Sequence, residues 1–150
     1  MFEPGHLTDR KPPFRFAVYT RVGFSDTDAQ CVVYYGRYLP YFDLARTEYH
    51  RHLREGAMPG AAEFVMRASD VEYLAPARFD DLLEVFVRAA HIGRTSVTYE
   101  YAVYRISDDD EPLMATARQT IVLIDHSTRV KVSVPDEFRS RLSSFEGVSL

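Results

Sequence analysis

One stretch of this chain repeats its apolar residues at helical spacing, and strand-like sequence lies on both sides of it. Between about residues 35 and 55 the apolar positions recur at steps of three and four, which is the pattern of one face of a helix. Pro40 fits a helix only in the first turn, so the regular helix is expected to begin near Arg37. Gly56 and Pro59 are expected to end it. The chain is therefore predicted to contain one long helix.

Strand-like patterns fill most of the remaining sequence. Residues 14–23 alternate between two sets of side chains, as in a strand with two different faces. Four later runs are rich in Val, Tyr, Phe and Thr, and they are Phe64–Tyr73, Leu82–Ile92, Thr95–Ile106 and Leu113–Asp125. One strand, one helix and four strands in succession predict an α+β domain, in which the helix packs on one face of an antiparallel sheet.

The chain has the length of a single domain, and neither an internal repeat nor a shift in composition divides it. The first residues are rich in Pro, Gly and charge, so residues 1–13 are expected to form a flexible N-terminal arm. Residues 14–143 are expected to form the folded domain, with a short helix beginning at Pro135. Residues 144–150 are expected to form a C-terminal tail.

Composition argues against several classes of protein. The formal net charge of −4 disfavours nucleic-acid binding, which requires a basic stripe. No apolar run approaches the roughly 18 residues of a membrane span, so none is expected. The N-terminus has no basic flank followed by apolar residues, so no secretory signal is expected. The single cysteine, Cys31, fits a reducing compartment, and we expect a cytoplasmic protein.

Asp26 and Asp28 lie in a polar loop between the first strand and the helix, and a longer motif follows them. The sequence from Phe24 to Glu48 resembles the signature of the 4-hydroxybenzoyl-CoA thioesterase family, D-x-D-x-x-G-x-V-x-Y…Y-x-x-Y/F-D/E-x-A-R. The segment Val71–Asp81 is similar to the family's Y-x-x-P-x-x-F/Y-x-D, and Asp125–Pro135 to its last strand and exit. The resemblance extends over about residues 14–140.

The resemblance implies a hotdog fold, in which a long central helix is wrapped by a curved five-stranded antiparallel sheet. It also implies obligate dimers, often assembled into tetramers, with active sites formed at the subunit interface. The order of elements expected from the residues themselves agrees with this fold.

The resemblance also implies roles for two residues near the start of the helix. Asp28 matches the catalytic carboxylate, which either attacks the thioester or activates water, and the sequence leaves both routes open. The backbone N–H near Tyr35 matches the group that polarises the thioester carbonyl, and the free N–H groups of a helix start suit an oxyanion. Asp26 is expected to shape the loop, and a structural role of the same kind is the alternative for Asp28.

Four further residues are expected to contact substrate, and they are Asp43, Arg94, Arg129 and Lys131. Asp43 occupies the family's acidic position in the helix, where it either meets a polar group of the acyl chain or pairs with Arg46 or Arg37. The three cations lie where family members often place contacts to coenzyme A, whose phosphates suit Arg and Lys.

Cys31 departs from the family pattern, which more often has Gly at this position. Gly permits backbone angles that Cys disfavours, so the backbone conformation of this loop is in question. A reactive thiol near the helix start is the alternative to a passive loop cysteine. The five histidines show no metal-binding spacing and no phosphate-binding glycine motif is present, so neither a metal nor an organic cofactor is expected.

These observations predict a homo-oligomeric hydrolase that splits an acyl-CoA or acyl-carrier thioester into free acid and thiol. Two alternatives remain open. A hotdog hydratase or dehydratase needs a His acting with a carboxylate at the start of the helix, and no His lies between residues 7 and 49. A non-catalytic acyl-CoA-binding module would use Asp28 only as a structural residue.

Overall fold

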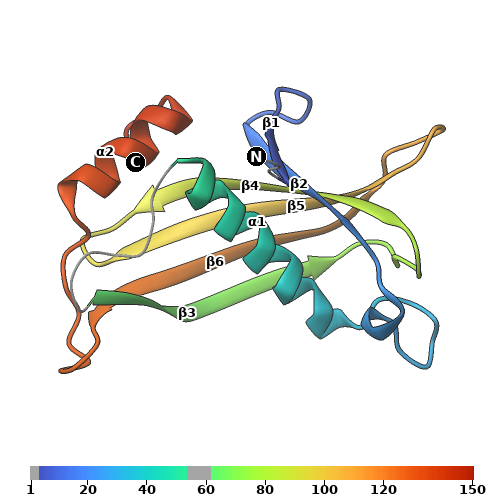
Figure 1. The fold of residues 1–150 in the computed structure, drawn as a ribbon, viewed down its shortest axis with the longest axis horizontal. Coiled ribbons are helices and arrows are strands. Elements are labelled where there is room, and N and C mark those ends of the chain that lie inside the picture. Colours follow the sequence, from blue (N-terminus) through green and yellow to red (C-terminus); the bar gives the residue numbers. More distant parts are fainter. Residues whose placement is uncertain (1–3, 54–61) are drawn as a thin grey trace.

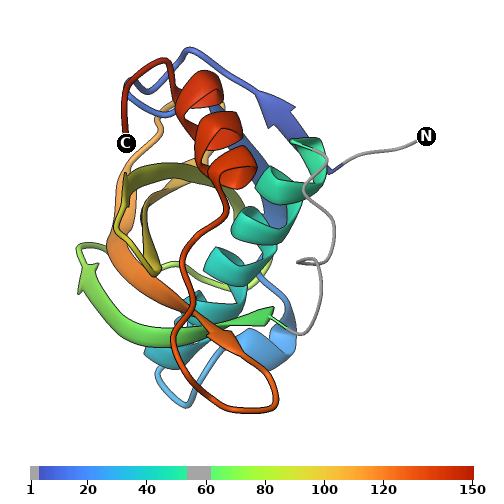
Figure 2. The same ribbon diagram turned by 90° about the vertical axis from the view of Figure 1, so that its left-hand side faces the viewer.

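A computed structural model describes residues 4–53 and 62–150, in which six strands form one antiparallel sheet beside one long and one short α-helix. The strands are β1 (Gly5–Leu7), β2 (Phe16–Arg21), β3 (Ala62–Tyr73), β4 (Leu82–Ile92), β5 (Ser96–Ile106) and β6 (Leu113–Asp125), and the helices are α1 (Tyr38–His52) and α2 (Asp136–Glu146). The order across the sheet is β1-β2-β4-β5-β6-β3. The sheet curves around α1, which crosses its concave face (Figure 1 and Figure 2). Neither helix of the described segments is long and apolar enough to cross a membrane.

The face of α1 that meets the sheet is largely aromatic. Its buried residues are Tyr38, Tyr41, Phe42, Ala45, Glu48 and Tyr49. Phe42 is fully buried, and its ring centroid lies 4.8 Å from that of Tyr101 on β5. Truncating a buried aromatic side chain of this kind costs roughly 3–5 kcal/mol, so this face fixes the position of α1 on the sheet.

The sequence predicted most of the regular elements. α1 contains Pro40 in its first turn, as expected, while the expected helix end at Gly56 and Pro59 lies outside the described residues. β4 and β6 have the predicted bounds, and β3 and β5 begin within two residues of the predicted positions. The period of the apolar residues identified α1, whereas composition identified the four later strands, because Leu83–Val87 of β4 are all buried and show no alternation.

The N-terminal segment differs from the expected flexible arm. Gly5–Leu7 forms β1 and pairs with β2, so the sheet has six strands where five were expected. The His6 Nε2 atom lies 2.8 Å from Glu84 Oε1, and Arg10 donates a hydrogen bond to Glu84 Oε2 at 2.6 Å. Glu84 is fully buried, and a buried carboxylate requires such partners. The segment is therefore ordered by a residue far along the chain, which the local sequence does not indicate.

The C-terminal helix extends beyond the expected domain end at residue 143. α2 runs to Glu146, whose carboxylate accepts hydrogen bonds from the Tyr49 hydroxyl at 3.0 Å and from the Ala89 N–H at 3.1 Å. These bonds attach the last turn of α2 to both α1 and β4. Residues 147–150 follow α2, and Leu150 returns to it by donating its N–H to Ser143 Oγ at 3.3 Å.

His50 of α1 is half-buried against β5 and α2. Its Nε2 atom lies 2.6 Å from the Tyr99 hydroxyl, and its ring stacks on Phe138 with 5.5 Å between centroids. Burial lowers the pKa of His50 to about 4, and the positive charge of Arg46 acts in the same direction. The imidazole is therefore neutral near physiological pH.

We expect His50 to make the fold less stable in mild acid. Between the ordinary histidine pKa of 6.5 and the folded value of about 4, the unfolded chain binds a proton that the folded chain does not. The free energy of unfolding should therefore fall as the pH is lowered through this window, by up to about 1.4 kcal/mol per pH unit. Urea unfolding measured between about pH 7 and about pH 4.5 should show that the free energy of unfolding falls less for His50→Gln than for the native chain. If the free energy of unfolding changed with pH equally in the two proteins, His50 would not be the cause of the acid sensitivity.

Candidate active site

Asp26 holds the loop between β2 and α1 in shape. Its Oδ2 atom accepts hydrogen bonds from the Gly23 N–H at 2.8 Å and from the Tyr41 hydroxyl at 2.9 Å. Its backbone carbonyl accepts the N–H of Tyr34 at 2.9 Å, and its Oδ1 atom lies 3.5 Å from the Arg37 Nε. Burial, with the Asp26 carboxylate in support, raises the pKa of Tyr41, so its hydroxyl stays protonated as a donor. These contacts give Asp26 the loop-shaping role that the sequence predicted.

Asp28 lies in a tight turn of the same loop and is half-buried. Its Oδ1 atom accepts the N–H of Gln30 at 2.8 Å, and its backbone carbonyl accepts the N–H of Cys31 at 2.9 Å. Its own N–H donates to the Val32 carbonyl at 3.0 Å. No described residue donates a hydrogen bond to the Oδ2 atom, so one carboxylate oxygen is free to act on a bound molecule.

Cys31 adopts a left-handed backbone conformation, with φ of 63°. Residues other than Gly disfavour this conformation because Cβ approaches the following carbonyl oxygen. The family more often has Gly at this position, which put the backbone geometry of the loop in question. The turn beside Asp28 does require the positive φ that Gly tolerates. The Cys31 side chain is exposed.

Tyr35 begins a 3₁₀ turn, η2 (Tyr35–Arg37), that continues directly into α1. The first hydrogen bond of this turn joins the Arg37 N–H to the Tyr34 carbonyl at 2.8 Å. The N–H groups of Tyr35 and Gly36 precede that bond and have no intrahelical acceptor. Two donors and the positive end of a helix therefore lie at Tyr35.

A hollow of about 300 Å³ lies beside Asp28 and Tyr35. Its lining comes from the loop that carries Asp28, from the start of the helix at Tyr35 and Tyr38, and from the segment 73–76 that follows β3. Asp28 is the one charged side chain among the described residues that line it, and most of the others are apolar or aromatic. The hollow can therefore hold an apolar group next to a carboxylate and the start of the helix at Tyr35.

Asp43 lies outside the lining of the hollow, on the exposed side of α1. Its Oδ1 atom accepts a hydrogen bond from Arg46 Nη2 at 2.7 Å, which is one of the pairings that the sequence left open. The mostly buried Arg46 also donates to the Tyr101 hydroxyl at 3.0 Å and to Gln119 Oε1 at 2.9 Å. The sequence did not single out Tyr101 or Gln119, because both lie far from Arg46 along the chain.

The three predicted cations lie on the turns that follow β4 and β6. Arg94 belongs to the β4–β5 turn, where its carbonyl accepts the N–H of Val134 at 2.9 Å. Arg129 and Lys131 follow β6, and Lys131 forms an isolated bridge with Ile124. All three side chains are exposed.

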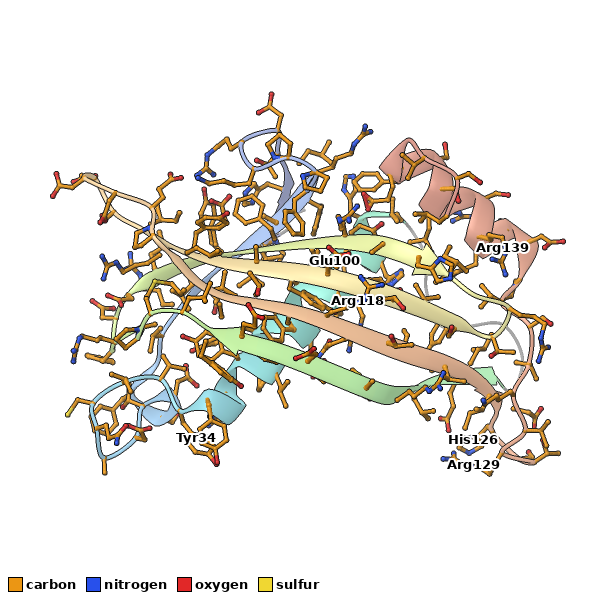
Figure 3. The ribbon with its side chains drawn as sticks, turned by 180° about the vertical axis from the view of Figure 1, so that it is seen from behind. Tyr34, Glu100, Arg118, His126, Arg129 and Arg139 are labelled. Carbon is orange, nitrogen blue, oxygen red and sulfur yellow. The ribbon has the colours of Figure 1, made fainter. Side chains whose placement is uncertain are left out.

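These cations lie far from the hollow within one chain. Arg129 donates to Glu63 Oε1 at 2.7 Å, near the start of β3, whereas the hollow lies at Tyr73, the end of the same strand. Glu63 and Tyr73, near opposite ends of β3, are roughly 33 Å apart at 3.3 Å per residue. Figure 3 shows Arg129 at one end of the sheet and Tyr34, next to Tyr35, at the other. One chain therefore does not bring the predicted cations together with Asp28.

Three further tyrosines lie at the start of the helix. Tyr38 and Tyr41 are buried, while the ring of Tyr34 is 44% exposed. In residues 4–53 and 62–150, no group of three or more His, Cys, Asp or Glu side chains could hold a metal ion.

Comparison with known proteins identifies relatives over most of the chain. A family model described as "Thioesterase-like superfamily" matches residues 22–142. The acyl-CoA thioester hydrolase YbgC of Escherichia coli O6:H1 is 36% identical over 115 residues, which are 75% of this chain and 82% of that protein. The acyl-CoA thioesterase YbgC of Haemophilus influenzae is 30% identical over 83% of this chain and 92% of its own length.

Solved structures share the fold. A thioesterase superfamily protein from Jannaschia sp. CCS1 has a TM-score of 0.83 at 22% identity, covering 92% of this chain and 87% of its own. A 4-hydroxybenzoyl-CoA thioesterase in complex with 4-hydroxybenzoyl-CoA has a TM-score of 0.76 at 18% identity, covering 85% and 97%. The hotdog fold expected from the sequence is confirmed.

We expect Cys31→Gly to be at least as stable as the native chain and Cys31→Val to be less stable. The left-handed conformation costs a residue other than Gly roughly 1–2 kcal/mol, and a β-branched side chain is stiffer still. Gly relieves this strain but adds entropy to the unfolded chain, which offsets part of the gain. Thermal unfolding checks the order, with Cys31→Ser as the control for loss of the thiol. A Cys31→Gly protein less stable than Cys31→Val would contradict the strained turn.

Proposed function

The chain belongs to the thioesterase-like superfamily and is a thioester hydrolase, and we propose that it cleaves acyl-CoA thioesters with the carboxylate of Asp28. The observation that carries the proposal is the hollow that Asp28 shares with the helix start at Tyr35. Thioester hydrolysis needs a base or nucleophile and donors for the charge on the carbonyl oxygen. Coenzyme A as the thiol is supported by the relatives from Escherichia coli and Haemophilus influenzae, which are named for acyl-CoA.

In the proposed reaction, the acyl group enters the hollow and the thioester carbon lies next to Asp28. Either the free Oδ2 oxygen attacks this carbon and water then hydrolyses the mixed anhydride, or the carboxylate takes a proton from an attacking water. In both routes the C–S bond breaks, the thiolate of coenzyme A takes up a proton, and water supplies the oxygen of the new carboxylic acid. Neither route uses a metal or an organic cofactor.

We assign stabilisation of the oxyanion to the N–H groups of Tyr35 and Gly36. The positive end of a helix favours negative charge, and the helix that begins at Tyr35 continues through α1. Backbone donors of this kind contribute about 3–4 kcal/mol to transition-state stabilisation. A Cβ atom on Gly36 would lie 2.9 Å from the Tyr34 ring, so a larger residue would displace that ring.

We propose that a second copy of the chain completes the site. β3 is an edge strand of 12 residues, and its residues 66–70 are exposed. A long exposed edge strand pairs readily with another chain. Antiparallel pairing of two β3 strands about a two-fold axis sets the start of one beside the end of the other. Arg129 and Lys131 of the second copy would then lie near this chain's hollow, where they can bind the phosphates of coenzyme A.

The carboxylate mechanism predicts a large loss of activity in Asp28→Asn. Thiol release should be measured with butyryl-CoA, decanoyl-CoA and benzoyl-CoA, which represent short, long and aromatic acyl groups. We expect the native chain to turn over at least one of them and Asp28→Asn to be slower by about 10²-fold or more, the contribution of a general base. Asp109→Asn, in the exposed β5–β6 loop, is the control and should keep native activity.

Two outcomes would contradict this account. Equal turnover by Asp28→Asn and the native chain would exclude the carboxylate mechanism. A lack of turnover by the native chain, together with binding of the same acyl-CoAs, would favour a binding module.

The proposed dimer predicts that a charge on the β3 edge separates the copies. The native chain should sediment at twice its 17.3 kDa mass or a higher multiple. Met66→Lys places a cation on an apolar residue that is 45% exposed on β3, and it should give a monomer with reduced turnover. Leu7→Lys makes the same change on β1, the other edge strand, and should leave the assembly intact. A native monomer would refute the shared site.

A further inference from the structure

We propose that Tyr73 is a positioning residue for the oxyanion-binding peptide group at the start of the helix, an inference that rests on the proposed function. Tyr73 is the last residue of β3, and its hydroxyl donates a hydrogen bond to the backbone carbonyl of Tyr35 at 3.0 Å. Its ring lies 5.5 Å from that of Tyr38 and 6.4 Å from that of Tyr35. Within the described segments, no other side chain bonds to the backbone of Tyr35 or Gly36.

The carbonyl that Tyr73 holds belongs to the peptide group that also contains the N–H of Gly36. The C=O and N–H of a trans peptide point in opposite directions, so a bond that fixes the carbonyl also fixes the direction of the N–H. The same carbonyl accepts the N–H of Tyr38, and two donors on one carbonyl polarise the peptide. A polarised peptide makes the N–H of Gly36 a stronger donor.

Tyr73 is itself well anchored for this purpose. The two residues that follow it, Leu74 and Ala75, donate their N–H groups to the Met114 carbonyl at 2.9 and 3.1 Å. This attaches the end of β3 to β6. Burial raises the pKa of Tyr73, so its hydroxyl remains protonated and able to donate at neutral pH.

The test removes the Tyr73 hydroxyl and keeps its ring. Tyr73→Phe should lower kcat by roughly 3- to 10-fold, the effect of one net hydrogen bond, on whichever of the three acyl-CoAs the native chain cleaves fastest. KM should stay within about twofold and the melting temperature should not change, because the ring contacts remain. Tyr104→Phe removes a hydroxyl from a ring on the opposite face of the sheet, and this control should keep native kinetics.

An infrared measurement reports the polarisation of the substrate directly. The same acyl-CoA is added to Asp28→Asn, which we expect to bind it without rapid cleavage, and the thioester carbonyl band is recorded. Adding Tyr73→Phe should move the band to higher frequency, since a weaker donor polarises the carbonyl less. Adding Tyr104→Phe should leave the band in place.

The outcomes separate this inference from the proposed function. A native kcat in Tyr73→Phe would overturn the role of Tyr73, and so would a lower kcat that comes with a lower melting temperature and an unmoved carbonyl band. In either case, a loss of activity in Asp28→Asn would still support the thioesterase. Native turnover in Asp28→Asn overturns the proposed function and this inference with it.

Discussion

The burial of the aromatic face of α1 in the concave face of the sheet is the interaction on which the rest of the structure depends. Phe42 and Tyr49 are fully buried there, so the helix cannot slide along the sheet without opening the core. That fixed position sets where the helix begins. Its first free N–H groups therefore lie beside the end of β3 and the loop that carries Asp28, and the hollow forms among these three segments.

Two aspartates of one loop have different roles because their surroundings differ. Asp26 accepts hydrogen bonds from Gly23 and Tyr41 and lies near Arg37, so its carboxylate is occupied in holding the loop. Asp28 borders the hollow, and only one of its oxygens accepts a hydrogen bond from a described residue. The proposed chemistry uses the oxygen that the fold leaves unbound, and the strained turn at Cys31 shapes the loop around it.

The sequence predicted the features that local spacing determines and missed those that depend on distant residues. The period of α1 reflects which of its side chains are buried, and the Val, Tyr, Phe and Thr content of the long strands reflects strand propensity, so both could be identified. β1 depends on Glu84, and the Tyr73 bond to Tyr35 joins segments 38 residues apart, so neither could be seen in the local sequence. The resemblance to the family predicted that Arg129 contacts coenzyme A. Its distance from the hollow could not be predicted, because it depends on which end of β3 Arg129 lies beside.

In the proposed mechanism, Asp28 and the helix start act on the same thioester. A crystal structure of Asp28→Asn with bound benzoyl-CoA, or with whichever acyl-CoA the native chain prefers, tests it most directly. The thioester oxygen should lie about 2.7–3.2 Å from the N–H nitrogen of Tyr35 or Gly36, and the residue 28 side chain should lie about 3–3.5 Å from the carbonyl carbon. A thioester bound outside the hollow, or with its carbonyl oxygen directed to solvent, would contradict it.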